Sequence, residues 1–391
     1  MLLSLSFILI FGMLAGWLCS KLKLPPLMGM LIVGIIIGPS CLNILDISVL
    51  NISAQIRKIA LIIILLRAGL NLKVEDLKKV GRPAILMCFV PASLEIIGML
   101  LIAPMLFKLS IVDSLILGTV IAAVSPAVIV PHMLKIMEEG YGVKKGIPQM
   151  ILAGASADDV FVIVLFTSIL GIAGGGTFDS LSLMRIPSSI LLGIAGGIAA
   201  GYVLHMFLSK VNLSSEKTLI LFLSVSFLLV TLEDSMTGFI GFSGLIAVMA
   251  MGMMFARNSG KKAERLSKGY SKLWVASEIF LFVLVGAAVD ISHALQAGIT
   301  AIILIFAVLL FRMVGVAVCV AGTKLEWKER LFCMIAYTPK ATVQAAIGAI
   351  PLSLGLSSGN IILTVAVIAI LITAPLGAFM INLTYKKFLS V

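Results

Sequence analysis

The sequence predicts an all-α polytopic membrane protein, and three observations support this prediction. First, 61% of the 391 residues are hydrophobic and only 12% are charged, about half the charged share of roughly 25% in soluble domains. Second, apolar runs of about 20 residues, long enough to cross a bilayer as helices, recur along the whole chain. Third, the alternation over about ten residues that marks a β-barrel strand is not found. This composition excludes a soluble enzyme, a disordered chain and a disulfide scaffold.

The apolar runs divide into thirteen predicted membrane segments. Each is long enough to cross about 30 Å of hydrocarbon when tilt is allowed. The first is expected to be a retained helix and not a signal peptide, because it has no basic start and no cleavage signal. The segments run approximately over residues 2–19, 27–43, 55–71, 83–107, 111–134, 147–173, 186–209, 217–232, 238–256, 273–290, 297–321, 331–355 and 360–384.

The charges in the loops between these segments set the predicted orientation. Alternate loops, together with the C-terminal end, hold 22 of the 29 Lys and Arg residues. By the positive-inside rule the N-terminus lies outside and the C-terminus is cytoplasmic, in a cell (plasma or inner) membrane. The same rule explains the net charge of +11, and no basic stretch with aromatic residues predicts a nucleic-acid partner. The longest loop, about residues 257–272, is too short for an attached regulatory domain.

Two of the segments carry a hydroxyl–proline pair in the middle of an apolar run. The pairs are Ser125-Pro126 in the fifth segment and Thr338-Pro339 in the twelfth. Proline removes a backbone donor and disfavours helix at the residue before it, so both segments are predicted to break at mid-membrane. Seven segments separate the two copies, so the copies cross in opposite directions. This predicts an inverted 6+1+6 repeat with the seventh segment as linker, and a transport site where the breaks meet.

The sixth segment carries two adjacent carboxylates, Asp158 and Asp159. They lie about 16 Å along a helix, near the bilayer centre, where ionisable groups are costly and mark function. Carboxylate oxygens suit a hard cation, and a carboxylate in a dry site can also hold a proton. Exchange of Na⁺ for H⁺ at this pair requires both properties. Small residues before the pair allow close helix packing, and Ser156 among them is a further possible ligand.

Three other charged residues are predicted to lie at depth. Lys340 follows the second break and either pairs with Asp158 or loses its proton and acts as a carrier. Glu95 and Arg312 occupy equivalent positions in the two halves and are expected to pair. Arginine does not readily lose its proton, so Arg312 is a structural or gating cation. With the aspartate pair, the formal charges of this group sum to −1, which suits one cation or one proton.

These features together resemble the cation–proton antiporter superfamily. The resemblance includes the aspartate pair, the two broken helices, and the stretches TPKATVQAAIG (338–348) and FVLVGAAVDI (282–291). It covers essentially the whole chain and is to monovalent cation:proton antiporters, specifically bacterial relatives of the animal NHA-type sodium/proton exchangers. The resemblance implies an NhaA-like antiporter fold and a homodimer in contact with membrane lipids, with a core that moves against a dimerisation scaffold in an elevator-type cycle. The implied parts of this single transmembrane unit, residues 1–391, are a core of about 83–173 and 297–384, a scaffold of about 1–71 and 217–290, and a linker helix of about 186–209.

The resemblance also implies roles for single residues. Those that match the family's ion-binding pair are Asp158 and Asp159, and those that match its membrane-embedded charge cluster are Glu95, Arg312 and Lys340. The chain departs from the family at two places. Many electrogenic bacterial relatives have a lysine at the position of Arg312, and some electroneutral relatives have Thr-Asp where this chain has Ser125-Pro126. The stoichiometry therefore stays open between one proton and two per cation.

Three functions of different classes follow from these residues. The first is exchange of Na⁺ or Li⁺ for H⁺ in pH homeostasis, by a transporter that is not an enzyme and uses no cofactor beyond the transported ions. The second is K⁺/H⁺ exchange, because the sequence does not set the radius of the site. The third is sodium-coupled symport of an organic anion on a similar scaffold. Lys340 would permit this third function, but the adjacent acids disfavour it.

Overall fold

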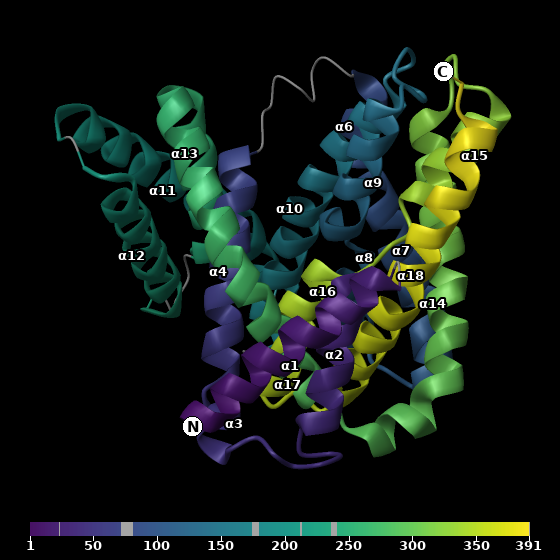
Figure 1. Ribbon diagram of the computed structural model, residues 1–391, viewed down its shortest axis with the longest axis horizontal. Helices are drawn as coiled ribbons and strands as arrows, with labels where there is room; N and C mark the ends of the chain where they lie inside the picture. The colour runs from purple at the N-terminus through teal and green to yellow at the C-terminus, as the bar shows by residue number, and fades with distance from the viewer. Residues whose placement is uncertain (23, 72–80, 174–179, 212, 236–240, 391) are drawn as a thin grey trace. The chain divides into compact units, whose positions relative to one another are not determined.

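The computed structural model describes residues 1–22, 24–71, 81–173, 180–211, 213–235 and 241–390, and every regular element within them is a helix (Figure 1). The side chains of residues 156, 172–173, 180–187, 234–235 and 293–296 also lie outside this description. The helices are α1 (Leu2–Lys21), α2 (Pro26–Ile37), α3 (Ile47–Asn51), α4 (Ser53–Asn71), α6 (Arg82–Met87), α7 (Val90–Phe107), α8 (Ile111–Ala122), α9 (Pro126–Glu138), α10 (Ile147–Ala173), α11 (Ser180–Lys210), α12 (Ser215–Ser235), α13 (Gly244–Ala287), α14 (Ile291–Val320), α15 (Trp327–Ala336), α16 (Thr342–Ile347), α17 (Ile350–Ser353) and α18 (Gly359–Phe388).

The chain divides into two compact units. Unit 1 comprises residues 1–54, 74–166 and 279–391, and unit 2 comprises residues 55–73 and 167–278. This division follows packing and does not coincide with the predicted core and scaffold, because α1 and α2 belong to the unit that holds α7 and α14.

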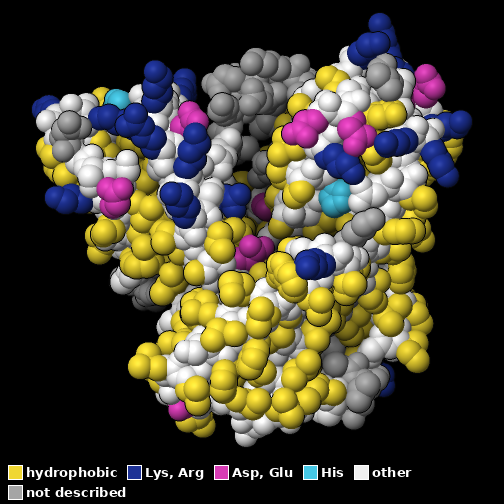
Figure 2. Space-filling model, viewed as in Figure 1, with side chains coloured by type: hydrophobic (Ala, Val, Ile, Leu, Met, Phe, Trp, Pro, Cys, Tyr) yellow, Lys and Arg dark blue, Asp and Glu magenta, His cyan; other side chains and the backbone are white. Residues whose placement is uncertain are grey.

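The helices have the lengths and surfaces of a polytopic membrane protein. Within the described ranges, nine helices are long and apolar enough to cross a membrane. Large apolar side chains are exposed along them, as at Leu14, Phe207, Leu228 and Leu310, which is where lipid would replace water. Figure 2 shows hydrophobic side chains over the flanks of the helices. Lys and Arg side chains gather over the middle part of α13 in unit 2 and over one end of α9 and of α15 in unit 1.

Both predicted breaks are present. The fifth segment stops as α8 at Ala122, is extended over residues 123–125 and resumes as α9 at Pro126. The twelfth stops as α15 at Ala336 and resumes as α16 at Thr342. Each break lies beside its proline, as expected from the missing backbone donor.

Two further interruptions and one junction differ from the predicted segments. The fourth segment is two helices, α6 and α7, because Pro91 lies in the first turn of α7 and cannot continue the preceding helix. The twelfth is interrupted again at Gly348, just before α17. The ninth and tenth segments are joined in α13, which is kinked at Gly260, where φ is 36°. Only glycine adopts such a backbone at no steric cost.

Glycine spacing explains how close the helices of unit 2 approach. The run 193–201 on α11 places glycines four residues apart, and a Cβ at Gly197 would lie 2.3 Å from the Ala247 carbonyl oxygen of α13. A Cβ at Gly201 would lie 2.6 Å from the Met251 carbonyl oxygen. Only hydrogen fits at these contacts, so the backbones of α11 and α13 pack directly against each other.

Polar contacts join three chain segments at one end of unit 1. The Tyr385 hydroxyl of α18 donates to Glu139 Oε2 at 2.8 Å, just past the end of α9. Lys386 Nζ lies 3.4 Å from the same oxygen. Lys145, before α10, forms an ion pair of 2.9 Å with Glu329 in the first turn of α15. Three basic loops predicted to be cytoplasmic therefore lie together.

The opposite end of unit 1 has its own polar contact. Ser110 caps α8, and the Ser358 hydroxyl, just before α18, donates to Asp113 Oδ1 of α8 at 2.6 Å. The fifth segment thus begins at this end, whereas the twelfth begins at the basic end beside Lys145. The two broken segments therefore run antiparallel, as the sequence predicts.

Replacing Glu139 by glutamine should lower stability near neutral pH but not in acid. The hydrogen bond from Tyr385 and the nearby Lys386 hold the pKa of Glu139 below its ordinary value, so its contribution is complete above about pH 4.3, the ordinary glutamate pKa, and is lost as pH falls. Melting in detergent should show a difference between wild type and Glu139→Gln that is constant from pH 7 to about pH 4.3, the ordinary glutamate pKa, and shrinks as pH falls below it. Glu138→Gln removes the same charge one residue earlier and should melt like wild type. A Glu139→Gln difference that grows in acid would contradict the assignment.

Candidate ion-binding site

The predicted charged residues come together inside unit 1. Asp158 and Asp159 lie on α10, Glu95 on α7, Arg312 on α14, and Lys340 in the extended segment between α15 and α16. The carboxylates of Glu95 and Asp158 and both cationic side chains have no solvent exposure. A buried charge is tolerated only when it is paired and hydrogen-bonded, so their contacts define what the cluster can do.

Asp158 is held at the first break. Its Oδ2 accepts hydrogen bonds from the Val124 backbone N–H at 2.9 Å and from Arg312 Nη2 at 2.8 Å. The first of these donors is available because the α8 helix has ended two residues earlier. Its Oδ1 has no partner among the described residues. Asp158 is therefore an ionic bridge between α10, the break and α14.

Arg312 is the centre of the cluster. Besides Asp158 it contacts Glu95 Oε2 through Nη1 at 2.8 Å, and its Nε donates to the Tyr337 carbonyl at 2.6 Å. Nη1 also donates to the Ala122 carbonyl at the end of α8. The guanidinium thus joins both breaks to two acids. This matches the predicted Glu95–Arg312 pair and adds Asp158 to it.

Lys340 pairs with a different acid from the one expected. Its Nζ lies 2.6 Å from Glu95 Oε2, the same oxygen that Arg312 contacts. Pairing with Asp158 was the conservative expectation, but in the structure Arg312 is the ion-pair partner of that carboxylate. The Lys340 backbone N–H donates to Thr373 Oγ1 of α18 at 2.9 Å, which fixes the extended segment in place.

Asp159 differs from its neighbour. No Lys or Arg of the described chain lies within ion-pair distance of its carboxylate, and its buried Oδ1 has no hydrogen-bond partner there. Its side chain is partly exposed, whereas Asp158 is fully buried. Adjacent residues on a helix point about 100° apart, so one carboxylate faces the ionic cluster and the other faces away from it.

The two broken segments are hydrogen-bonded to each other. The Ser125 backbone N–H donates to the Pro339 carbonyl at 2.8 Å. Ser125 Oγ is buried without a partner among the described residues, whereas Thr338 Oγ1 donates to Ile335 at the end of its own helix. Gly377 of α18 permits the second break, because a Cβ there would lie 2.4 Å from the Pro339 ring. Pro126 begins α9.

Three residues that the sequence argument did not single out support this geometry. Tyr337 donates through its hydroxyl to the Met87 carbonyl at 3.0 Å, a group freed where α6 ends before Pro91. Its ring lies 5.0 Å from the Arg312 guanidinium. Thr373 caps Lys340, and Gln344 binds two carbonyls at the end of α8. In the sequence, the signal that could have identified each of these three residues is a polar side chain within an apolar run.

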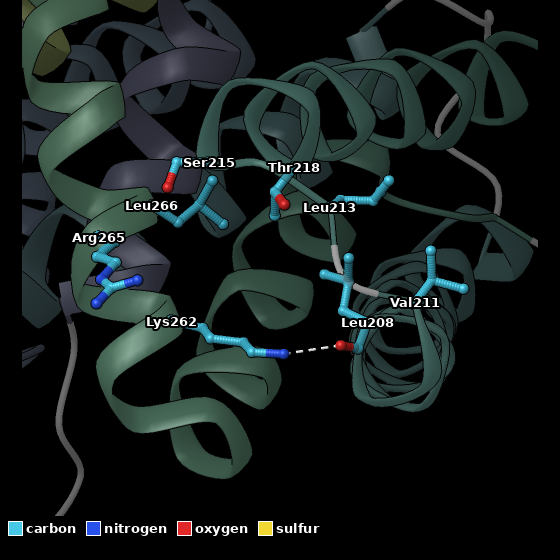
Figure 3. Close-up of a pocket in the computed structure, with 8 residues that line it drawn as sticks. All are labelled: Leu208, Val211, Leu213, Ser215, Thr218, Lys262, Arg265 and Leu266. Carbon is cyan, nitrogen blue, oxygen red and sulfur yellow. Dashed lines mark hydrogen bonds between the residues drawn. The ribbon is translucent and has the colours of Figure 1, made fainter.

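One predicted ligand and one cavity remain. The side chain of Ser156, a predicted further ligand, lies outside the described residues. The cavity in Figure 3 encloses about 80 Å³ within unit 2, where Lys262 Nζ donates to the Leu208 carbonyl at 2.8 Å. None of its lining residues belongs to the charge cluster, so cavity size does not locate the ion site.

The formal charges of the five residues in the cluster determine what it can bind. Two acids, Glu95 and Asp158, are joined to two cations by contacts of 2.6–2.8 Å, which leaves one negative formal charge on Asp159. A carboxylate oxygen without a donor is a ligand for a hard cation or an acceptor for a proton, but a single oxygen cannot bind both at once.

Comparison with known proteins identifies relatives over nearly the whole chain. The family model described as "Sodium/hydrogen exchanger, transmembrane" matches residues 7–387. Sodium/hydrogen exchanger 9B2 of Xenopus tropicalis is 33% identical over 399 residues, with 96% of this chain and 72% of the relative covered. The human 9B2 protein is 35% identical over 396 residues, with 94% and 70% covered. Human sodium/hydrogen exchanger 9B1 is 32% identical over 381 residues, with 94% and 73% covered.

A solved structure matches the fold. The sodium proton antiporter MjNhaP1 from Methanocaldococcus jannaschii, solved at pH 8, superposes with a TM-score of 0.85 over 98% of this chain and 97% of its own. A second structure of that protein, from electron microscopy, gives a TM-score of 0.77. Sequence identity is 23% in both, so this likeness concerns the fold alone: an all-α, multi-pass membrane antiporter fold.

Proposed function

The chain belongs to the transmembrane sodium/hydrogen exchanger family, and from this we propose that it exchanges Na⁺ or Li⁺ for H⁺ across the cell membrane as a secondary active transporter. Asp159, together with Asp158, is the ion and proton site in this proposal. Glu95, Arg312 and Lys340 hold the site in shape and balance its charge. The transported ions are substrates, and the proposal involves no cofactor and no enzymatic step.

One observation carries the proposal: Asp159 is the acid of the cluster that has no ion-pair partner within the described chain, while Glu95 and Asp158 are both paired. A site with one unbalanced negative charge beside a buried ionic cluster gains from binding either a cation or a proton. Because Na⁺ and H⁺ would occupy the same carboxylate, each must leave before the other binds. That competition is the chemical basis of exchange.

Alternating access completes the cycle. We place the moving core at residues 83–173 and 297–384 and the dimerisation scaffold at residues 1–71 and 217–290, with an elevator-type movement between them. The antiparallel broken segments that hydrogen-bond at Ser125 and Pro339 support a site at their crossing. The proposal includes thirteen membrane segments in an inverted 6+1+6 repeat, an outside N-terminus, a cytoplasmic C-terminus and a homodimer.

Transport by purified protein in proteoliposomes tests the proposal. A pH-sensitive dye trapped inside should report proton movement when Na⁺ or Li⁺ is added outside, and no movement in protein-free vesicles. A panel of Li⁺, Na⁺, K⁺ and Rb⁺ chlorides decides selectivity. A response to K⁺ alone would replace the proposal with K⁺/H⁺ exchange. Sodium-dependent uptake of an organic anion without proton movement would replace it with symport.

Exchange should be insensitive to membrane voltage. Arg312 does not lose its proton and already pairs with Asp158, so Asp159 is the acid left to release a proton, one for each Na⁺. Rates measured with and without a potential imposed by K⁺ and valinomycin should agree within error. A rate that follows the imposed potential would show that more than one proton moves per cation, and would mean that Asp158 or Lys340 also titrates during the cycle.

A further inference from the structure

The end of α8 presents three consecutive backbone carbonyl groups to the interior of unit 1. The helix stops at Ala122, so the carbonyls of its last turn lack intrahelical partners. The carbonyls of the last two helical residues and of Ala123, just past the helix, each accept a side-chain hydrogen bond. Gln344 Nε2 donates to the Ile121 carbonyl at 3.1 Å and to the Ala123 carbonyl at 2.8 Å, and Arg312 Nη1 donates to the Ala122 carbonyl between them.

These contacts fix the orientation of the Gln344 amide. The side chain is fully buried on α16, two residues past the helix start. An amide nitrogen has two hydrogens, and both are used on the carbonyls of α8. The amide oxygen therefore points away from them, and it is buried without a partner among the described residues. Gln344 is the only side chain in the described part of the chain that donates to the Ile121 and Ala123 carbonyls.

Free carbonyls at this position would be cation ligands. The C-terminal end of a half-helix carries partial negative charge, and unwound carbonyls at such ends coordinate cations. The Ile121 and Ala123 carbonyls lie three residues and one residue before Val124, whose N–H binds Asp158. The number of carbonyl oxygens available to an ion, and how rigidly they are held, govern the choice between Na⁺ and the larger K⁺.

We infer that Gln344 is a specificity-determining positioning residue. By occupying the Ile121 and Ala123 carbonyls, it keeps them from ligating the transported cation, and it holds the first break closed around a small ion. The ion site is then limited to few oxygens, a set that suits Li⁺ and Na⁺ and leaves K⁺ without enough ligands to replace its water. This inference rests on the proposed exchange of a monovalent cation for a proton.

Replacing Gln344 by methionine tests the inference, because methionine has a similar length and no hydrogen-bond donor. In the proteoliposome assay, the rate ratio of K⁺ to Na⁺ should rise about tenfold relative to wild type, the factor that one hydrogen bond of roughly 1.4 kcal/mol represents. Loss of packing alone would lower the rates for all cations together and leave the ratio unchanged. A wild-type ratio, or an equal loss for Li⁺, Na⁺ and K⁺, would overturn the inference.

Two more variants keep the test decisive. Gln344→Asn keeps the amide but is one methylene shorter, so it reaches one carbonyl at most; it should shift the ratio in the same direction, and it replaces Gln344→Met if that variant does not fold. Ile347→Val is the matched control, since Ile347 is buried on the same helix and offers no side-chain hydrogen bond. Its ratio should equal that of wild type, and a shift there would assign the effect to packing.

Failure of the proposed function and failure of this inference give different results. If wild-type protein moves no protons with any cation, the proposed function fails and the ratio is not measurable. If wild-type protein exchanges Na⁺ and Li⁺ for H⁺ and the Gln344 variants keep its ion preference, the proposed function stands and the inference is wrong.

Discussion

Replacing Asp159 by asparagine should abolish cation-driven proton exchange while leaving the fold intact. Asparagine has the same size but neither binds a proton nor carries the negative charge left unbalanced in the cluster. Because the Asp159 carboxylate has no ion-pair partner within the described chain, its loss breaks no ionic contact. We expect the exchange rate to fall by about two orders of magnitude, the effect of roughly 3 kcal/mol on a barrier.

Two measurements separate loss of function from loss of folding. The variant should elute and melt like wild type in detergent, but added Na⁺ should no longer raise its melting temperature, since a ligand stabilises only a state that binds it. Asp113→Asn is the matched control: it makes the same chemical change in an acid that accepts from Ser110 and Ser358 away from the cluster. It should keep wild-type exchange. Full exchange by Asp159→Asn would contradict the assigned site.

Replacing Arg312 by methionine should instead destabilise the protein. The change leaves Asp158 without its cation and frees the carbonyls of Ala122 and Tyr337 inside the protein. Removing one partner of a buried ion pair costs about 3–5 kcal/mol. We expect a clear drop in the melting temperature in detergent, with a larger aggregated fraction during purification.

A second substitution identifies the cause. Adding Asp158→Asn to Arg312→Met removes the uncompensated charge, so the double variant should melt at a higher temperature than Arg312→Met alone. Arg265→Met, on an exposed part of α13, should melt like wild type. If Arg312→Met melts like wild type, the guanidinium does not hold the cluster together.

The sequence was most informative where a signal is local. The breaks at Ser125-Pro126 and Thr338-Pro339 were predictable because proline acts on the residue before it and on its own donor, wherever the segment packs. The antiparallel course of the two segments followed from counting segments. The aspartate pair was identifiable as a candidate site because carboxylates in an apolar helix are costly.

The pairing inside the cluster was not predictable from the sequence. Arg312 and Lys340 are both long, flexible cations, and which acid each one contacts depends on where α7, α10 and α14 cross. We expected Lys340 to neutralise Asp158, but from its position in the extended segment its Nζ forms an ion pair with Glu95. The roles of Tyr337, Thr373 and Gln344 depend in the same way on backbone groups freed elsewhere in the chain.

The single oxygen of Glu95 that both cations contact makes the two cations unequal in what the loss of each would leave unpaired. If Lys340 is lost, Glu95 still has Arg312, and Asp158 is unaffected. If Arg312 is lost, Lys340 still serves Glu95, but Asp158 is left without its ion-pair partner. Replacing Lys340 therefore leaves every paired carboxylate with one ion-pair partner, although it adds one uncompensated negative charge, whereas replacing Arg312 with an uncharged residue leaves Asp158 with none. The two cations are thus unequal: one is a second partner of Glu95, and the other is the sole ion-pair partner of Asp158 within the described chain.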